Sequence, residues 1–287
     1  MILQRRSALV LLLATLIAAS GSYAHAQFPQ GLGGFLGGLR GEQGDAPEIP
    51  PQEFPDRNFA TCRMFYTSVR REANGAGWRT DYPWGERHLM IRLSELTKTR
   101  ISLLSPEVPH AWLVRLTDES LFQCPYLVAS DVGTIGLSQI EAERLREYLL
   151  KGGFLWVDDF WGSFAWEQWS HEIARALPAS DYAIEDVPLS DPIFHSMLEV
   201  AKVPQITSIR FWRASGGRST SERGEDSAVA HFRGIRDKAG RLMVVMTHNT
   251  DVADSWEREG EDPEFFYQFS PDGYALGINV VLYALTH

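Results

Sequence analysis

Two adjacent carboxylates, Asp158 and Asp159, follow directly after an apolar run at residues 154–157. Like charges repel at a buried strand end, so such a pair needs a cation, a hydrogen-bond donor or a raised pKa. Paired carboxylates of this kind perform acid/base chemistry or hold a metal in hydrolases, and His248, which also ends an apolar run, is a further candidate. These three residues are the catalytic candidates if the chain is an enzyme. The structural alternative is that strand-end Asp residues terminate strands and cap the following helices.

Other polar and aromatic side chains follow the remaining apolar runs. Open parallel sheets bind ligands beyond the carboxyl ends of their strands, so these side chains are expected to face one crevice. Aromatic rings there would suit a ligand groove such as a sugar site, although most aromatic residues near Asp159 are expected to pack in the core. The candidate ligand-binding residues are Asp81, Tyr82, Trp84, Asp131, Asp159, Phe160 and Trp161.

One short segment carries four oxygen-bearing side chains, which are Asn249, Asp251, Asp254 and Glu257. Oxygen ligands are those that a hard cation such as Ca²⁺ prefers. The segment lacks the glycine turn and the ligand spacing of an EF-hand, and a solvated acidic loop explains the same pattern. It is therefore a candidate metal site with a structural alternative. No HExxH or similar motif is present, and no cofactor is predicted.

Apolar runs predict the strands that would position these residues. Helical patterns lie between several of them, and the clearest begins at Ser138 with Glu141 as a capping box and ends at Gly152-Gly153. A strand, a helix and a second strand in this order form a βαβ unit, which imposes parallel pairing. Strands are predicted at residues 59–65, 101–104, 126–129, 154–157 and 242–246, and further helices at 85–97, 163–177 and 272–285.

Residues 227–248 differ, because two β-rich runs flank the turn sequence at residues 237–240. This pattern predicts an antiparallel hairpin. Residues 178–204 show only turns and short strands. The predicted fold is therefore α/β, a mainly parallel flavodoxin-like three-layer sandwich with an added antiparallel hairpin.

The N-terminal residues have the order of a secretory signal peptide. Arg5 and Arg6 precede an apolar stretch at residues 8–19, and a small-x-small cleavage site ends at Ala26. The stretch is shorter than the ~20 residues of a membrane-spanning helix, so cleavage and export to the periplasm or beyond are expected. The predicted organisation is a signal peptide at 1–26, a Gly/Pro-rich flexible tether at 27–57 and one domain at 58–287.

Charge and cysteine content limit the partners. The formal net charge is −10, which repels phosphate backbones and anionic lipids and argues against nucleic-acid binding. No later stretch is apolar for long enough to span a membrane. The chain has two cysteines, Cys62 and Cys124, which either form a disulfide or stay buried as free thiols.

Several short motifs occur together between about residue 59 and the C-terminus. They are Arg63-Met64-Phe65-Tyr66, Thr80-Asp81-Tyr82-Pro83, Pro125-Tyr126, Leu149-x-x-Gly152-Gly153-Phe154, Asp158-Asp159-Phe160 and Leu276-Gly277-x-Asn279-x-x-Leu282-Tyr283-Ala284-Leu285. In combination they resemble the bacterial family catalogued as domain of unknown function 4159. The resemblance implies a fold similar to class I glutamine amidotransferases, in which a nucleophilic Cys stands on a strained turn between a strand and a helix.

The corresponding turn, at residues 157–163, contains no cysteine. Glutaminase chemistry requires an activated thiolate, so this activity is not expected. The leading hypothesis is an exported, non-catalytic domain that binds a small ligand or an envelope protein in the strand-end crevice. A hydrolase or metal-dependent enzyme that uses the carboxylates, and a structural component of an envelope complex, are the alternatives.

Overall fold

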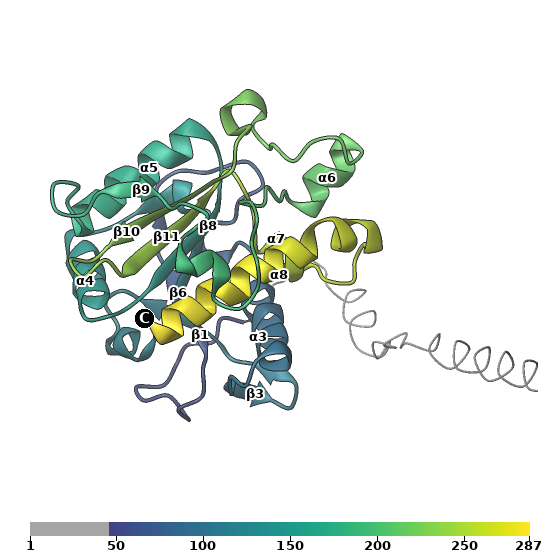
Figure 1. Cartoon of the computed structure of the whole chain (residues 1–287). Coiled ribbons are helices and arrows are strands. Elements are labelled where there is room, and N and C mark those ends of the chain that lie inside the picture. The colour runs from purple at the N-terminus through teal and green to yellow at the C-terminus, as the bar shows by residue number, and fades with distance from the viewer. Residues whose placement is uncertain (1–45) are drawn as a thin grey trace, which may run out of the picture. The chain divides into compact units, whose positions relative to one another are not determined.

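The computed structural model describes residues 46–287, which form one α/β domain (Figure 1). The predicted signal peptide and most of the predicted tether lie outside the described residues. Within the described part, no helix combines the length and the apolar character needed to cross a bilayer.

A seven-stranded sheet forms the centre of the domain, in the order β5-β1-β6-β8-β11-β10-β9. The first five strands in this order run parallel, whereas β10 is antiparallel to both of its neighbours. This confirms the mainly parallel sheet with an added hairpin. The strands are β1 (Thr61–Phe65), β5 (Ala111–Arg115), β6 (Leu127–Ser130), β8 (Leu155–Phe160), β9 (Ile184–Asp186), β10 (His231–Arg236) and β11 (Leu242–His248).

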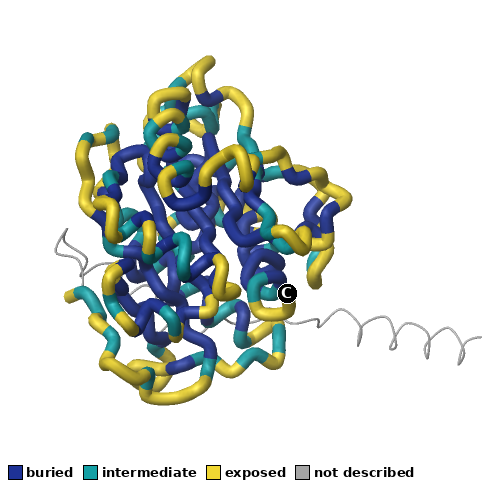
Figure 2. Tube along the Cα trace, turned by 90° about the vertical axis from the view of Figure 1, so that its left-hand side faces the viewer, coloured by how far each residue is buried: buried dark blue, intermediate teal, exposed yellow. Residues whose placement is uncertain are grey.

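Helices cover both faces of the sheet, and the buried chain runs between them through the middle of the domain (Figures 1 and 2). Apolar residues of α4 and α5 pack on one face, and those of α3 and α8 pack on the other, which gives the three layers. The helices are α3 (Trp84–Leu96), α4 (Gln139–Leu150), α5 (Gly162–Ala176), α6 (Ile209–Ser215), α7 (Asp254–Glu257) and α8 (Pro263–Thr286).

Local sequence chemistry explains where these elements begin. The Ser138 side chain accepts a hydrogen bond from the Glu141 backbone, and the Glu141 side chain accepts one from the Ser138 backbone, so the predicted capping box starts α4. Asp262 caps α8 by accepting from the backbone of Glu264 and Phe265, and Pro263 occupies the first turn.

Two predictions about elements were wrong. The predicted strand at residues 101–104 gives only β3 (Leu103–Ser105), an exposed strand that pairs with β4 (Val108–Pro109) outside the main sheet. The strand next to β1 is β5. The register pairs Thr61 with Ala111, and most residues of both strands are buried. Helix α8 begins at Pro263, well before the predicted residue 272, and contains Pro271 in its interior.

Residues before 58 already contact the domain. The backbone of Glu48 bridges to Trp112 of β5, and its carboxylate accepts hydrogen bonds from Arg87 and contacts His110 at 2.9 Å. The packed part of the chain thus begins before the boundary expected from composition, because Glu48 supplies the charge that buried Arg87 needs.

The cysteines form a disulfide that joins β1 to the loop before β6. Cys62 and Cys124 are both buried, with Cα atoms 6.0 Å apart. This decides between the two alternatives that the sequence left open.

Candidate functional site

A cavity of about 240 Å³ lies where several parallel strands end. Its walls come from residues at or after the ends of β1, β6, β8 and β11, and from residues 208–223. This is the edge at which open parallel sheets bind ligands. Four arginines, Arg79, Arg210, Arg223 and Arg258, contribute to the wall. Eight carboxylates line it as well, which are Glu72, Asp81, Asp131, Asp159, Glu222, Asp251, Asp254 and Glu257.

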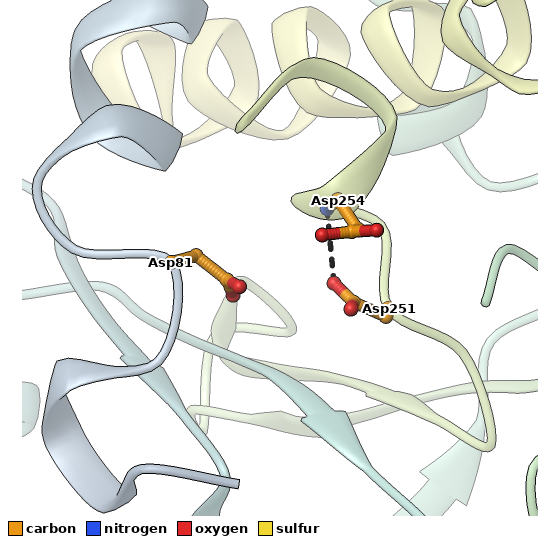
Figure 3. Close-up of side chains that lie close together, drawn as sticks. All are labelled: Asp81, Asp251 and Asp254. Carbon is orange, nitrogen blue, oxygen red and sulfur yellow. Dashed lines mark hydrogen bonds between the residues drawn. The ribbon is translucent and has the colours of Figure 1, made fainter. Parts of the chain in front are cut away.

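Three of the aspartates converge on one point. One carboxylate oxygen from each of Asp81, Asp251 and Asp254 lies within 4.8 Å of the other two. Figure 3 shows the carboxyl group of Asp81, from the segment before α3, facing those of Asp251 and Asp254 at the start of α7. Oxygen atoms at such separations match the coordination sphere of a hard divalent cation.

Backbone groups hold two of these three aspartates in place. The Asp254 N–H donates to Asp251 Oδ1 at 2.9 Å, and the Ile209 N–H donates to Asp254 Oδ2 at 2.5 Å. Asp251 and Asp254 are 3% and 4% exposed. The geometry of the cluster is therefore set by folded backbone.

Two of the four arginines in the wall pair with glutamates. Arg223 pairs with Glu222 at 3.5 Å, and Arg258 pairs with Glu257 at 3.0 Å and more distantly with Asp254. Among residues 46–287, no salt bridge includes Asp81, Asp159 or Asp251. These three carboxyl groups of the cavity therefore have no side-chain counterion among the described residues.

Burial and mutual repulsion change the acidity of these groups. Desolvation is the largest cause and raises the pKa of Asp81, Asp159 and Asp251 well above the usual value, and neighbouring carboxylates raise each pKa further. Burial also raises the pKa of Asp131 to about 7, although the Gly77 N–H, which donates at 2.8 Å, lowers it. The cavity therefore favours protons or another cation.

Asp158 and Asp159 occupy different environments. Asp158 is 2% exposed and accepts hydrogen bonds from Thr247 Oγ1 at 2.6 Å and from the Ala253 N–H at 2.9 Å, so its role is structural. Asp159 lines the cavity and accepts from Trp161 Nε1 at 2.8 Å.

The two side chains diverge at an irregularity in the sheet. The pairing of β8 with β11 shifts register between Met246 and His248, so Asp158 and Asp159 together oppose Thr247. The backbone N–H of Gly162, which follows this pair, donates to Asn249 Oδ1 at 2.8 Å and not to either aspartate.

His248 lies away from the cavity, in a cluster of rings. It is 5% exposed and stacks near Phe160 and Trp166, with ring centroids 4.9 and 5.2 Å away. Its Nδ1 lies 3.3 Å from a nitrogen of Arg233, which can only donate, so Nδ1 must accept and Nε2–H must donate to the Gly162 carbonyl at 3.1 Å. Burial lowers its pKa to about 4. A neutral ring in this place does not act as a base in the cavity.

Several other candidates also lie outside the cavity. Tyr82 is buried beneath the sheet edge, where its hydroxyl donates to Ala111, and Phe160 is in the core. Trp84 begins α3, where its ring contacts Arg87. The amide oxygen of Asn249 accepts from Gly162, so this side chain supports the fold. The candidates that line the cavity are Asp81, Asp131, Asp159, Trp161, Asp251, Asp254 and Glu257.

Sequence reasoning missed the wall opposite the strand ends. Glu72 and Glu222 come from loops without hydrophobic periodicity, and both side chains are nevertheless buried, at 6% and 3% exposure. Asn74-Gly75 next to Glu72 is a turn signal, yet nothing local indicates that this loop faces Glu222.

Comparison with known proteins identifies a family without assigning an activity. No curated protein matches the chain. The family model described as domain of unknown function (DUF4159) matches residues 66–285, which include all the cavity-lining residues. The chain belongs to this family of proteins with a domain of unknown function.

Proposed function

We propose that the protein is an exported, non-catalytic binding domain, and that its strand-end cavity binds a small polar ligand together with a divalent cation. The observation that carries the proposal is the convergence of Asp81, Asp251 and Asp254 in a cavity of about 240 Å³. This volume accommodates a ligand of roughly monosaccharide size beside an ion.

The electrostatics of the cavity favour a cation. A charged carboxylate that lacks both water and a counterion destabilises the folded protein. Asp81, Asp159 and Asp251 are desolvated in this way. A divalent ion neutralises two charges at once and replaces the lost hydration with direct coordination. Arg79 and Arg210, which line the cavity and form no salt bridge within residues 46–287, then remain available to contact anionic or hydroxyl groups of the ligand.

We further propose that the fold is related to the class I glutamine amidotransferases without sharing their chemistry. Asp159 lies on the turn from β8 into α5 with φ of 51°, a left-handed conformation at the place where the resemblance puts the nucleophile. Both cysteines are consumed in a disulfide, so no thiol can perform glutamine hydrolysis. The turn would thus keep the strained geometry and present a carboxylate.

A metal-dependent hydrolase is the second candidate function. The pKa of about 7 at Asp131, in the same cavity as the carboxylate cluster, is the observation that favours it. A group with this pKa exchanges protons efficiently near neutral pH, and a bound cation would activate water.

Calorimetric titration of the EDTA-treated mature protein with Ca²⁺, Mg²⁺, Mn²⁺ and Zn²⁺ tests the proposal. We expect saturable binding of at least one ion by the wild type and its loss in Asp251→Asn. Asp181→Asn, the same substitution at an exposed position, is the matched control and should bind as the wild type does. Absence of binding by all four ions would refute the cation site, and turnover of ester or phosphoester substrates would favour the hydrolase instead.

A further inference from the structure

We infer that Ser130 and Arg63 are positioning residues of the cation site, because they complete a buried chain of hydrogen bonds that fixes the carboxyl group of Asp81. This inference rests on the proposed function. The series of hydrogen bonds runs from Glu86 of α3 through Arg63 of β1 and Ser130 of β6 to Asp81. Glu86, Arg63 and Ser130 do not line the cavity.

The contacts form an unbroken series. Arg63 Nε donates to Glu86 Oε1 at 2.5 Å, and another guanidinium nitrogen of Arg63 donates to Ser130 Oγ at 2.7 Å. Ser130 Oγ donates in turn to Asp81 Oδ2 at 3.1 Å. Arg63, Glu86 and Ser130 are 1%, 3% and 1% exposed, so water does not compete for these bonds.

The chemistry of the donors fixes the direction of the series. A guanidinium group has no acceptor, so Arg63 must donate to Ser130 Oγ. The single hydroxyl hydrogen of Ser130 is then free to point at Asp81. This series of hydrogen bonds therefore presents a donor to Asp81 Oδ2 and holds the Asp81 carboxyl group in a defined orientation.

The positions of the residues explain why Asp81 needs this support. Asp81 lies in the segment between two helical elements with φ of 64°, and among residues 46–287 it forms no salt bridge. Ser130 is the last residue of β6, and Arg63 is in the middle of β1, so both belong to the rigid sheet. One oxygen of Asp81 is thus tied to the sheet, while the carboxyl group faces Asp251 and Asp254 (Figure 3). Sites built in this way hold their ligands to a defined geometry.

Arg63 affects the cation site indirectly, by positioning Asp81. Arg63 interacts electrostatically with Asp81, but its Nε is committed to Glu86. It therefore acts on Asp81 through Ser130, with the charge of Glu86 compensating its own in the interior.

Calorimetric titration of Ser130 variants with the ion that the wild type binds tests the inference. Ser130→Ala removes the donor to Asp81, and we expect about tenfold weaker binding, as for a lost hydrogen bond to a charged group. Ser130→Thr keeps the hydroxyl and should restore affinity to within about twofold of the wild type. Melting temperatures are measured alongside, because truncation of Ser130 also deprives Arg63 of an acceptor.

Ser102→Ala is the matched control for loss of stability. The Ser102 hydroxyl is buried and donates to Asp56 Oδ2 at 3.1 Å, the same kind of bond at the same distance, outside the cavity. This variant should bind the ion with wild-type affinity even if its melting temperature falls.

Each outcome separates the two proposals. Wild-type affinity in Ser130→Ala, or equal weakening in Ser130→Ala and Ser102→Ala, overturns the positioning role and leaves the cation site in place. Failure of the wild type to bind any of the four ions overturns the cation site, and the positioning role falls with it.

Discussion

Protonation of His248 is predicted to destabilise the fold in acid. Its neutral ring is held between the Gly162 carbonyl and Arg233, and burial lowers its pKa from 6.5 to about 4. Protonation would place a hydrogen on Nδ1, against the guanidinium of Arg233. Because the folded pKa is depressed, the stabilising contribution is complete above about pH 6.5 and is lost as the pH falls toward about 4. At about 1.36 kcal/mol per pH unit, the loss is about 3 kcal/mol.

Urea denaturation of the wild type and of His248→Gln at about pH 7 and about pH 4 measures this contribution. The free energy of unfolding should fall between the two pH values by about 3 kcal/mol more in the wild type than in the variant. His171→Gln, at an exposed position of α5, controls for the substitution itself. An equal fall in wild type and His248→Gln would refute the buried neutral ring and reopen His248 as an acid/base candidate.

Four further predictions concern the two aspartates of the pair, the disulfide and export. Asp158→Asn should lower the free energy of unfolding by about 2 kcal/mol, because its two carboxylate oxygens serve two different donors and an amide can satisfy only one. Asp159→Asn should instead raise the melting temperature of the ion-free protein, because it removes a buried charge near other carboxylates, and a lowered value would contradict this electrostatic reasoning. Reduction of the Cys62–Cys124 bond, which spans a sequence separation of 62, should cost about 4 kcal/mol in urea denaturation. Mass spectrometry of envelope-derived protein should find Gln27 at the N-terminus, and intact Met1 would refute cleavage.

Local sequence patterns predicted the elements whose signals are complete within a short stretch. The capping box at Ser138, the Gly152-Gly153 stop and the hairpin turn before Leu242 all have this property. The start of α8 was mispredicted because proline, here Pro271, lacks the backbone N–H that a helix interior uses and is typical of the first turn of a helix. The earlier turns of α8 are held by tertiary packing, in which Phe265 contacts Trp212 of α6.

The strand beside β1 could not be decided locally. Residues 101–104 and 111–114 are both short apolar runs, and either could fill the edge of the sheet. Only the pairing of β1 with β5, supported by Glu48 on the outer side, distinguishes them. Long-range pairing of this kind overrides propensity in strands.

Only the part of the site that lies at the strand ends could be predicted from the sequence. Asp131, Asp159 and Asp251 each follow a strand in the sequence, so the rule for parallel sheets indicated their common edge. The proximity of Asp81 to Asp251 and Asp254 depends on how the segment before α3 meets α7, which is a tertiary contact. His248 lies outside the cavity, next to the irregular pairing of β8 with β11, and its ring packs against Phe160.

Backbone strain supplies a separate argument that this edge of the sheet is specified for binding. Within residues 46–287, six non-glycine residues have positive φ, and four of them line the cavity, which are Asn74, Asp81, Asp131 and Asp159. A left-handed conformation costs about 1 kcal/mol or more for a residue with a side chain, even though Asn and Asp tolerate it best. Glycine would remove this cost at each position but would also remove the carboxylate. Three aspartates that combine a left-handed backbone with a desolvated carboxyl group weaken the fold twice over, and the cation binding that we propose would account for both costs together.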